Sequence, residues 1–182
     1  MQTEILLAGF GGQGVMFAGQ LLAYTAMDEG YEVTWIPSYG PEMRGGTAHC
    51  FVVISDHPIG SPIVRHPQIA LVFNAPSFEK YEPMVAAGGL LISNSSLISR
   101  TSTRTDISYQ EVPASTIAEE IGDARLTNVI MLGAMLQMQP IFPHEVLAES
   151  IKKHLPQRHQ KMLALNLQAL EAGAHHAQSH PT

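Results

Sequence analysis

Two glycine-rich stretches of this chain carry the residue types that could do chemistry. The first is Gly9-Phe10-Gly11-Gly12-Gln13-Gly14, whose first, third and sixth residues match G-x-G-x-x-G. It follows a short apolar run and opens a segment with apolar residues at helical spacing. In that setting the free N–H groups of a helix start bind a phosphate. The candidate cofactor-binding residues are therefore Gly9, Gly11, Gly12, Gln13 and Gly14.

A dinucleotide site of this kind needs a further residue. An acidic side chain about 20 positions on, at the end of the second strand, binds the ribose. The corresponding residues here are Thr34-Trp35-Ile36-Pro37, and Glu32 comes too early. We therefore favour close packing of the helix on the strand, or another phosphate-bearing ligand, over NAD or FAD.

The second stretch runs from Ser38 to Gly46 between two predicted strands. Its Gly-Pro and Gly-Gly pairs exclude a regular helix or strand. It still carries an aromatic residue, a carboxylate and a guanidinium, so it is either a tight hairpin connection with solvated charges or a loop that meets a partner. We predict an interface loop that opens on the same edge of the sheet as the first stretch, made of Tyr39, Gly40, Pro41, Glu42, Arg44, Gly45 and Gly46.

Other catalytic patterns are not found in the sequence. The 9 histidines are scattered through loops, helix ends and the C-terminal tail, so we predict surface positions and no metal site. The single cysteine, Cys50, lies in a predicted buried strand and is interpreted as a core residue. One cysteine excludes an internal disulfide and an iron–sulfur cluster ligated by this chain alone. Asn128 and Asn166 lie near apolar helical faces, where a cap or a buried amide hydrogen bond is expected.

The composition excludes several classes of function. The chain has 182 residues, 45% hydrophobic and 14% charged, with a formal net charge of -6. This length suits one domain with a real core. A negative charge without a Lys/Arg run argues against nucleic-acid and anionic-membrane binding. No apolar run is long enough to cross a bilayer and no signal peptide is apparent, so we expect a cytoplasmic protein.

The elements that must position the two glycine-rich stretches are strands and one helix. A strand over residues 4–8, a helix over 14–29 ended by Gly30, and a strand over 31–37 form a predicted right-handed βαβ unit. Further strands are predicted over 48–55, 69–73 and 90–93, with an edge strand over 109–113. The polar segment 94–108 is predicted to be a mobile surface segment.

The last third is predicted to be helical. Ser115 or Thr116 begins a helix that Gly122 ends, and Thr116 with Glu119 has capping-box spacing. Further helices are predicted over 129–138, 143–154 and 158–171, with Pro143 as the first residue of the second and Gly173 ending the third. We predict one domain over residues 1–174 and a disordered C-terminal tail over 175–182.

These residues together resemble a known family. The motifs that carry the resemblance are the two glycine-rich stretches, then Pro58-Ile59-Gly60-Ser61-Pro62, Asn128-Val129-Ile130-Met131-Leu132-Gly133 and Asn166. In this order they resemble the gamma subunit of 2-oxoacid:ferredoxin oxidoreductases over nearly the whole chain. The form Pro41-Glu42-Met43-Arg44-Gly45-Gly46 is more similar to the 2-oxoglutarate and branched-chain 2-oxoacid members than to the pyruvate members.

The resemblance implies an α/β fold, a three-layer α/β/α single domain with a mixed, largely parallel sheet. It also implies a non-catalytic subunit of a complex that oxidatively decarboxylates a 2-oxoacid, here expected to be 2-oxoglutarate, to an acyl-coenzyme A while reducing ferredoxin. Thiamine diphosphate lies between alpha and beta subunits of such complexes, and iron–sulfur clusters belong to other chains or domains. The expected partners are those subunits, with a delta ferredoxin-like subunit in some members. This chain is expected to hold no cofactor alone, and its two loops to face the active-site subunits or the path of coenzyme A.

Two other classes stay open at this point. One is a stand-alone dinucleotide- or nucleotide-binding regulatory protein, and the other is an orphan oxidoreductase. Co-purification with alpha and beta chains, together with thiamine- and coenzyme A-dependent ferredoxin or viologen reduction, separates the subunit from both.

Overall fold

The computed structural model covers residues 1–182, of which 1–40 and 47–180 are described. Within them the chain forms a six-stranded sheet in the order β2-β3-β1-β4-β5-β6. Neighbouring strands are parallel from β1 through β4 and β5 to β6. The remaining strand pairs are antiparallel, because β3 runs opposite to both β1 and β2. The strands are β1 (Gln2–Phe10), β2 (Glu32–Tyr39), β3 (Thr47–Ser55), β4 (Ile69–Val72), β5 (Leu90–Asn94) and β6 (Ser108–Val112).

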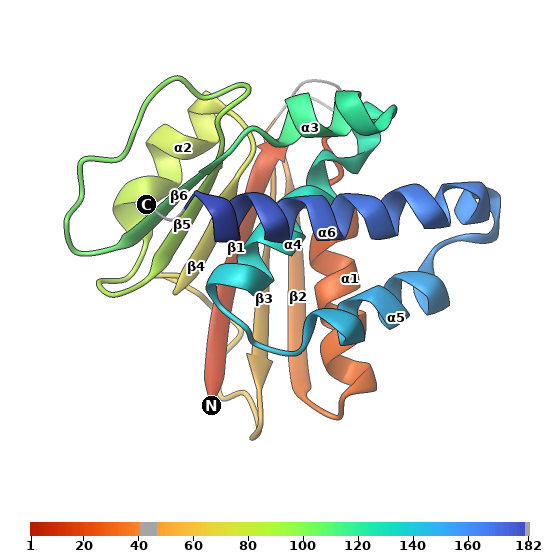
Figure 1. Cartoon of the computed structure of the whole chain (residues 1–182). Coiled ribbons are helices and arrows are strands. Elements are labelled where there is room, and N and C mark those ends of the chain that lie inside the picture. Colours follow the sequence, from red (N-terminus) through yellow and green to blue (C-terminus); the bar gives the residue numbers. More distant parts are fainter. Residues whose placement is uncertain (41–46, 181–182) are drawn as a thin grey trace.

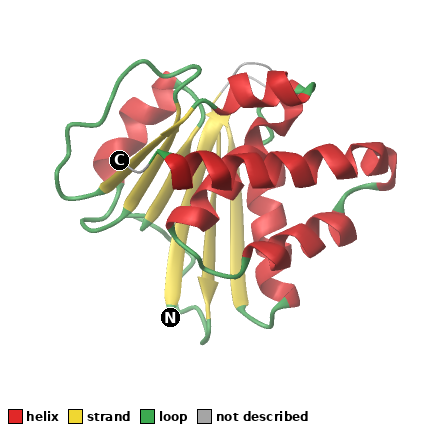
Figure 2. Ribbon diagram, viewed as in Figure 1, coloured by secondary structure: helices red, strands yellow, loops and turns green. Residues whose placement is uncertain are grey.

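Helices cover both faces of this sheet, which confirms the predicted α/β fold with a mixed sheet (Figures 1 and 2). The larger core lies between the sheet and five helices, and the smaller core lies on the other face under α2 (Ala75–Tyr81). The five helices are α1 (Val15–Asp28), α3 (Ala114–Ile121), α4 (Thr127–Met138), α5 (His144–His154) and α6 (Leu163–Ser179). Short 3-10 turns occur at η1 (Glu82–Met84), η2 (Ala124–Leu126) and η3 (Gln157–Met162). No helix in residues 1–40 and 47–180 is both long and apolar enough to cross a bilayer.

The central strand β1 is buried on both faces. Ile5 and Leu7 face the larger core, and Leu6 and Ala8 face the smaller one; all four are 0% exposed. A strand that is buried on both faces has a continuous run of apolar residues in its sequence. Such runs correctly predicted β1, β4 and β5. The carboxyl end of β1 leads directly into the first glycine-rich stretch, so this stretch starts from a strand whose central residues are fully buried.

Helix α4 is the centre of the helical layer and packs closely on α6. A Cβ atom added to Gly133 would lie within 3.0 Å of the carbonyl oxygen of Leu170, and one added to Gly173 would lie equally close to the carbonyl of Ile130. Only glycine permits two helix backbones to approach in this way. The contact places Asn128 on α4 and Asn166 on α6 on the same side of the glycine loop.

The first third of the chain is correctly predicted as strand, helix and strand, but the strands are not neighbours. β3 inserts between β1 and β2 and is antiparallel to both. β1 and β2 therefore run in the same direction with one strand between them. The helices and strands follow local patterns, but this sheet order depends on pairing between distant segments.

The predicted disordered tail over 175–182 is wrong for the residues that the structure describes. Helix α6 continues to Ser179, and Ala177 is only 1% exposed. Gln110 Nε2 also donates to the carbonyl oxygen of His180 at 3.0 Å. Gly173, interpreted as a helix stop, instead permits the close approach to α4. The His176 ring stacks on that of His180, which follows α6, with ring centroids 4.5 Å apart.

Two other local predictions differ from the structure. The predicted capping box is not formed, because Pro113 precedes α3 and the Thr116 hydroxyl bonds to that of Ser96 at 3.0 Å. The polar segment 94–108 is held in place rather than loose. Its Arg104 donates to the carbonyl oxygens of Glu82 at 2.9 Å and Val85 at 2.8 Å.

Candidate functional site

The glycine loop between β1 and α1 depends on positive backbone φ angles. Gly12 has φ 99° and Gly14, the residue preceding α1, has φ 75°. L-residues with side chains avoid this region. A Cβ atom at Gly14 would also collide with the side chain of Asn128. The loop is thus fixed by its own conformation and by α4, and it brings the N-terminal end of α1 to the surface.

The side chain of Gln13 ties this loop to the next parallel strand. Its Oε1 accepts hydrogen bonds from the backbone N–H of Phe10 at 2.7 Å and from Nδ2 of Asn74 at 3.2 Å. Its Nε2 donates to the carbonyl oxygen of Phe73 at 3.3 Å. Gly9 must be glycine here because a Cβ atom would lie 2.5 Å from the Gln13 oxygen.

This hydrogen-bonded bridge occupies the position where open α/β sheets usually bind a ligand. α1 leaves β1 toward the larger core and α2 leaves β4 toward the smaller one, so the carboxyl ends of these two parallel strands form a topological switch point. Gln13 and Asn74 fill that crevice. The strand beside β1 on its other side is the antiparallel β3, so the ribose-binding position of the dinucleotide fingerprint is not formed either.

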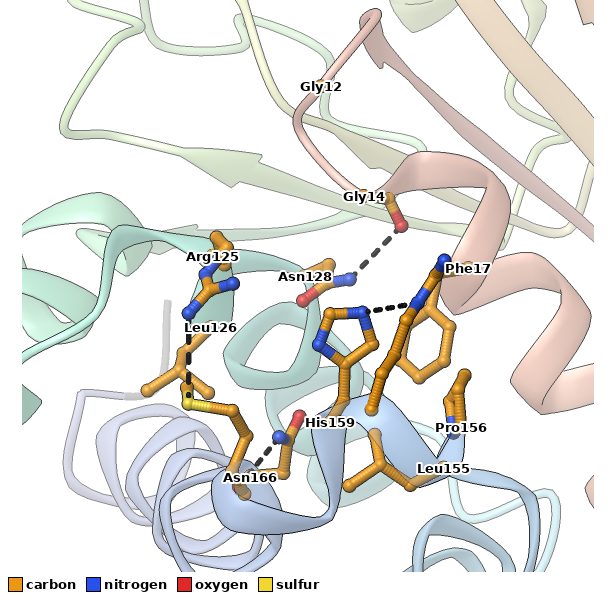
Figure 3. Close-up of a pocket in the computed structure, with 12 residues that line it drawn as sticks. Gly12, Gly14, Phe17, Arg125, Leu126, Asn128, Leu155, Pro156, His159 and Asn166 are labelled. Carbon is orange, nitrogen blue, oxygen red and sulfur yellow. Dashed lines mark hydrogen bonds between the residues drawn. The ribbon is translucent and has the colours of Figure 1, made fainter.

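The space for a ligand lies instead in a cavity that Gly12 and Gly14 of the loop line together with Asn128 of α4 (Figure 3). This cavity of about 320 Å³ extends from the loop to the start of α4 and to the turn between α5 and α6. Its lining combines apolar side chains with two arginines, a histidine and two asparagines: Gly12, Gly14, Phe17, Arg125, Leu126, Asn128, Leu155, Pro156, Arg158, His159, Met162 and Asn166.

Two arginines line the cavity, and only one of them is paired with a carboxylate. Arg125 is paired with Asp123, since its Nη2 lies 2.6 Å from Oδ2 and its Nε 2.9 Å from Oδ1. This pair lowers the pKa of Asp123 to about 2 and raises the pKa of Arg125. Arg158 donates from Nε to Nε2 of His159 at 3.1 Å and has no carboxylate partner among the described residues. Arg158 therefore supplies the uncompensated charge.

Two buried asparagines position the wall of this cavity. Asn128 is 4% exposed and donates from Nδ2 to the carbonyl oxygen of Gly14 at 3.1 Å, while its Oδ1 accepts from the backbone N–H of Val129 at 2.9 Å. Asn166 is 6% exposed and donates to the carbonyl oxygen of Met162 at 2.8 Å. The predicted buried amide bonds are confirmed. Their shared location was missed, because amides 38 positions apart give no local signal of a common cavity.

The second glycine-rich stretch is described only at its start. Tyr39 ends β2 with 68% of its surface exposed, and the N–H of Gly40 donates to the carbonyl oxygen of Thr47 at 2.8 Å. Pro41, Glu42, Arg44, Gly45 and Gly46 lie outside the described residues. Tyr39 and Gly12 line one hollow of about 310 Å³, so the described starts of both glycine-rich stretches meet at the same edge of the sheet.

Cys50 is a core residue, as predicted. It is 0% exposed, and burial raises the pKa of its thiol to about 12. A thiol with that pKa stays protonated at neutral pH and is a poor nucleophile.

Comparison with known proteins identifies the family. Residues 4–176 match the family model described as pyruvate ferredoxin/flavodoxin oxidoreductase. The ketoisovalerate oxidoreductase subunit VorA of Methanothermobacter thermautotrophicus is 39% identical over 174 residues, covering 95% of this chain but 36% of its own length. The chain thus spans about a third of that relative. The 2-oxoglutarate synthase subunit KorC of Methanocaldococcus jannaschii is 35% identical over 159 residues, covering 86% of this chain and 85% of its own.

Solved structures agree with this result. The gamma subunit of a keto/oxoacid ferredoxin oxidoreductase from Geobacter sulfurreducens has a TM-score of 0.85 at 25% identity and covers 100% of this chain and 99% of its own. The 2-oxoglutarate:ferredoxin oxidoreductase from Magnetococcus marinus shares the fold, with a TM-score of 0.89 at 22% identity over 98% of this chain and 31% of its own. The fold and the sequence thus define a gamma-type α/β domain, as the sequence motifs indicated. The chain belongs to the pyruvate ferredoxin/flavodoxin oxidoreductase family.

Proposed function

We propose that this chain is the gamma subunit of a 2-oxoacid:ferredoxin oxidoreductase that acts on 2-oxoglutarate and assembles with alpha and beta subunits. Several relatives named 2-oxoglutarate synthase subunit KorC support this substrate, for example that of Methanothermobacter marburgensis, which is 34% identical over 180 residues. The VorA relatives, 39% and 37% identical, make 2-oxoisovalerate the competing substrate.

In such a complex this chain performs no bond-breaking step. Decarboxylation takes place on thiamine diphosphate and electron transfer through iron–sulfur clusters, and both groups are proposed to belong to the other subunits. The chain's one cysteine cannot ligate a cluster by itself, and its thiol is buried with a raised pKa. Its proposed contribution is a surface beside the place where coenzyme A accepts the acyl group.

We propose that the cavity beside the glycine loop binds the phosphates of coenzyme A. One observation carries this proposal, namely that the N-terminal end of α1, Arg125 and Arg158 border the same cavity. Helix N-termini and guanidinium groups are the usual protein partners of phosphate. Apolar neighbours such as Phe17 and Leu155 suit the organic part of that molecule. The Magnetococcus marinus enzyme, which shares this fold, was solved with coenzyme A bound.

The experiment is to co-express the chain with its alpha and beta partners and to measure 2-oxoglutarate- and coenzyme A-dependent reduction of viologen. Arg158→Ala should raise the KM for coenzyme A about tenfold to hundredfold, because a hydrogen bond to a charged group contributes about 1.5–3 kcal/mol. Arg65 is exposed, forms no ion pair with the residues that the structure describes and lies outside the cavity, so Arg65→Ala is the matched control. An unchanged KM in Arg158→Ala contradicts the cavity assignment. Higher kcat/KM with 2-oxoisovalerate than with 2-oxoglutarate contradicts the substrate assignment.

The loop that begins at Tyr39 is proposed as the contact with the active-site subunits. Tyr39→Ala should lower the yield of the assembled complex without lowering the stability of the isolated chain, since this side chain is mostly exposed. Leu97→Ala, which removes another exposed apolar residue with 54% of its surface accessible, is the control. Equal yields from the two variants would contradict the interface assignment.

The stand-alone dinucleotide-binding alternative predicts a different result. Because Gln13 fills the switch-point crevice, the isolated chain should show no micromolar binding of NAD(H) in a calorimetric titration. Micromolar NAD(H) affinity, together with purification free of other subunits, would favour that alternative instead.

A further inference from the structure

A second groove, of about 330 Å³, lies between the C-terminal half of α1 and helix α5, and the function proposed above does not use it. Carboxylates dominate its lining, which carries Asp28, Glu29, Glu145 and Glu149 but only one lysine, Lys153. α1 also has no basic residue in its last turn, so the negative end of its dipole adds to the same field. The groove therefore attracts a cation.

Only part of this negative charge is compensated within the chain. Asp28 is paired with Nζ of Lys153 at 2.8 Å and with Nε2 of His154 at 2.7 Å. These hydrogen bonds lower the pKa of Asp28. Glu29 and Glu145 are exposed at the rim and have no ion-pair partner among the described residues. Two free carboxylates from different helices thus border one opening.

The floor of the groove contains a buried hydroxyl with no hydrogen-bond partner. Ser150 is 4% exposed, lines the groove, and its Oγ makes no hydrogen bond. Thr25 beside it is 0% exposed but is satisfied, because its hydroxyl donates to the carbonyl oxygen of Leu21 at 2.7 Å. A buried unpaired hydroxyl costs free energy unless something binds it. Ser150 is thus a second, independent sign of a ligand.

The arrangement of acceptors selects the kind of cation. A divalent metal needs several oxygen ligands around one point, and the described residues bring no three carboxylate or imidazole side chains together in that way. A guanidinium is a rigid planar fork that pairs with both oxygens of one carboxylate, so it suits acceptors in one plane better than acceptors divided between the rim and the floor. An ammonium presents three donors in different directions, which matches two rim carboxylates and one hydroxyl on the floor. Val146 lines the same groove and suits the alkyl stem of a lysine.

We propose that this groove receives a lysine side chain from a neighbouring subunit of the oxidoreductase complex. The inference rests on the proposed function, since it needs the assembled complex. The ammonium would be bound by Glu29, Glu145 and the Ser150 hydroxyl, so α1 and α5 would form a docking surface separate from the glycine loop.

The test begins with the assembled complex treated with a carbodiimide that joins carboxylates to amines in direct contact. Peptide mass spectrometry should show Glu29 or Glu145 joined to a lysine of another subunit, and Glu119 and Glu120 on α3 should show no such link. A wild-type preparation without other subunits would overturn the proposed function itself. An assembled complex without the cross-link overturns this inference alone.

Variants give the second readout, the NaCl concentration at which half of the partner subunits dissociate from immobilised chain. The double variant Glu29→Gln/Glu145→Gln should lower it at least twofold, whereas Glu119→Gln/Glu120→Gln, which removes two exposed α3 carboxylates, should leave it unchanged. Ser150→Ala should also lower it, yet the thermal stability of the isolated chain should not fall, because this hydroxyl has no partner there. Equal retention by all variants overturns the inference. One further result would also overturn the inference. If retention is unchanged in the variants, but the wild-type chain binds spermidine and the double variant does not, the groove binds a free polyamine.

Discussion

The side-chain amide of Asn128 donates a hydrogen bond to the backbone carbonyl oxygen of Gly14, 3.1 Å away and 114 positions earlier in the chain. This bond joins the starts of α1 and α4 and holds the loop that borders the cavity. The conformation of the glycine loop is therefore set by a helix from the other end of the sequence as well as by its own glycines.

Replacing Asn128 should destabilise the protein and loosen the loop. Asn128→Ala leaves the buried N–H of Val129 without its side-chain acceptor and removes one hydrogen bond from the carbonyl oxygen of Gly14, which still accepts from the N–H of Ala18. The loss costs about 1–3 kcal/mol of unfolding free energy. Urea denaturation measures this loss, and hydrogen exchange should rise over residues 10–15. Asn166→Ala removes the other buried amide of the cavity without touching the loop. If both variants raise exchange there equally, the bond to Gly14 does not control the loop.

Two glycines of the loop should respond differently to alanine. Both have positive φ, so each substitution carries a backbone penalty of about 1–2 kcal/mol. Gly12 has open space around it, whereas a Cβ atom at Gly14 collides with Asn128. Gly14→Ala should therefore lower the melting temperature more than Gly12→Ala. Equal melting temperatures would show that Asn128 yields to the new methyl group at no cost.

The contact between α4 and α6 should be the most sensitive position to added volume. Gly173→Ala places a methyl group against the carbonyl of Ile130, which is backbone and cannot move aside without separating the helices. We expect a loss of about 3 kcal/mol or more, at the upper end of overpacking costs. Gly60→Ala, where nothing lies within 4 Å, should change stability by less than about 0.5 kcal/mol. Chemical denaturation of the two variants checks the difference, and similar midpoints would contradict the close packing.

The Asp123–Arg125 pair predicts a pH dependence of stability. Arg125 lowers the pKa of Asp123 to about 2 from its ordinary value of 3.8, so the folded state releases this proton more readily than the unfolded state. The stabilisation is therefore fully present above pH 4 and is lost as the pH falls toward 2. Asp123→Asn should be less stable than the wild type at pH 7, and the difference should shrink across that window in thermal denaturation. If the stability difference between the two proteins does not change with pH, protonation of Asp123 is not coupled to folding.

Local patterns predicted much of this fold, and non-local packing explains what they missed. The buried strands around Ile5 and Leu71 are continuous apolar runs, and Gly122 and Pro143 mark helix ends that the structure also shows. The position of β3 could not be predicted, because strand order is decided by which distant strands pair. Gly173 was misinterpreted because the same residue serves as a helix stop or as a close-contact site, and only the neighbouring helix decides.

The candidate site was also predicted only in part, because local patterns define one portion of it and non-local packing the other. The glycine loop is a contiguous motif and was found in the sequence. Apart from Phe17, the rest of its cavity comes from Arg125, Arg158 and neighbours contributed by segments more than a hundred positions away. Arginines in a sequence give no sign of which loop they will face, so the positive charge beside the loop became apparent only in the fold.

The dependence of α4 on α6 has a consequence for synthesis on the ribosome. Every residue of α4 from Thr127 to Leu136 is buried in the finished fold, and part of that cover comes from α6, where Leu170 is 1% exposed. α4 leaves the ribosome before α6, so part of its apolar surface is uncovered until α6 is made. Nascent chains stalled before residue 163 should therefore bind chaperones that recognise apolar segments, and chains released after residue 180 should not.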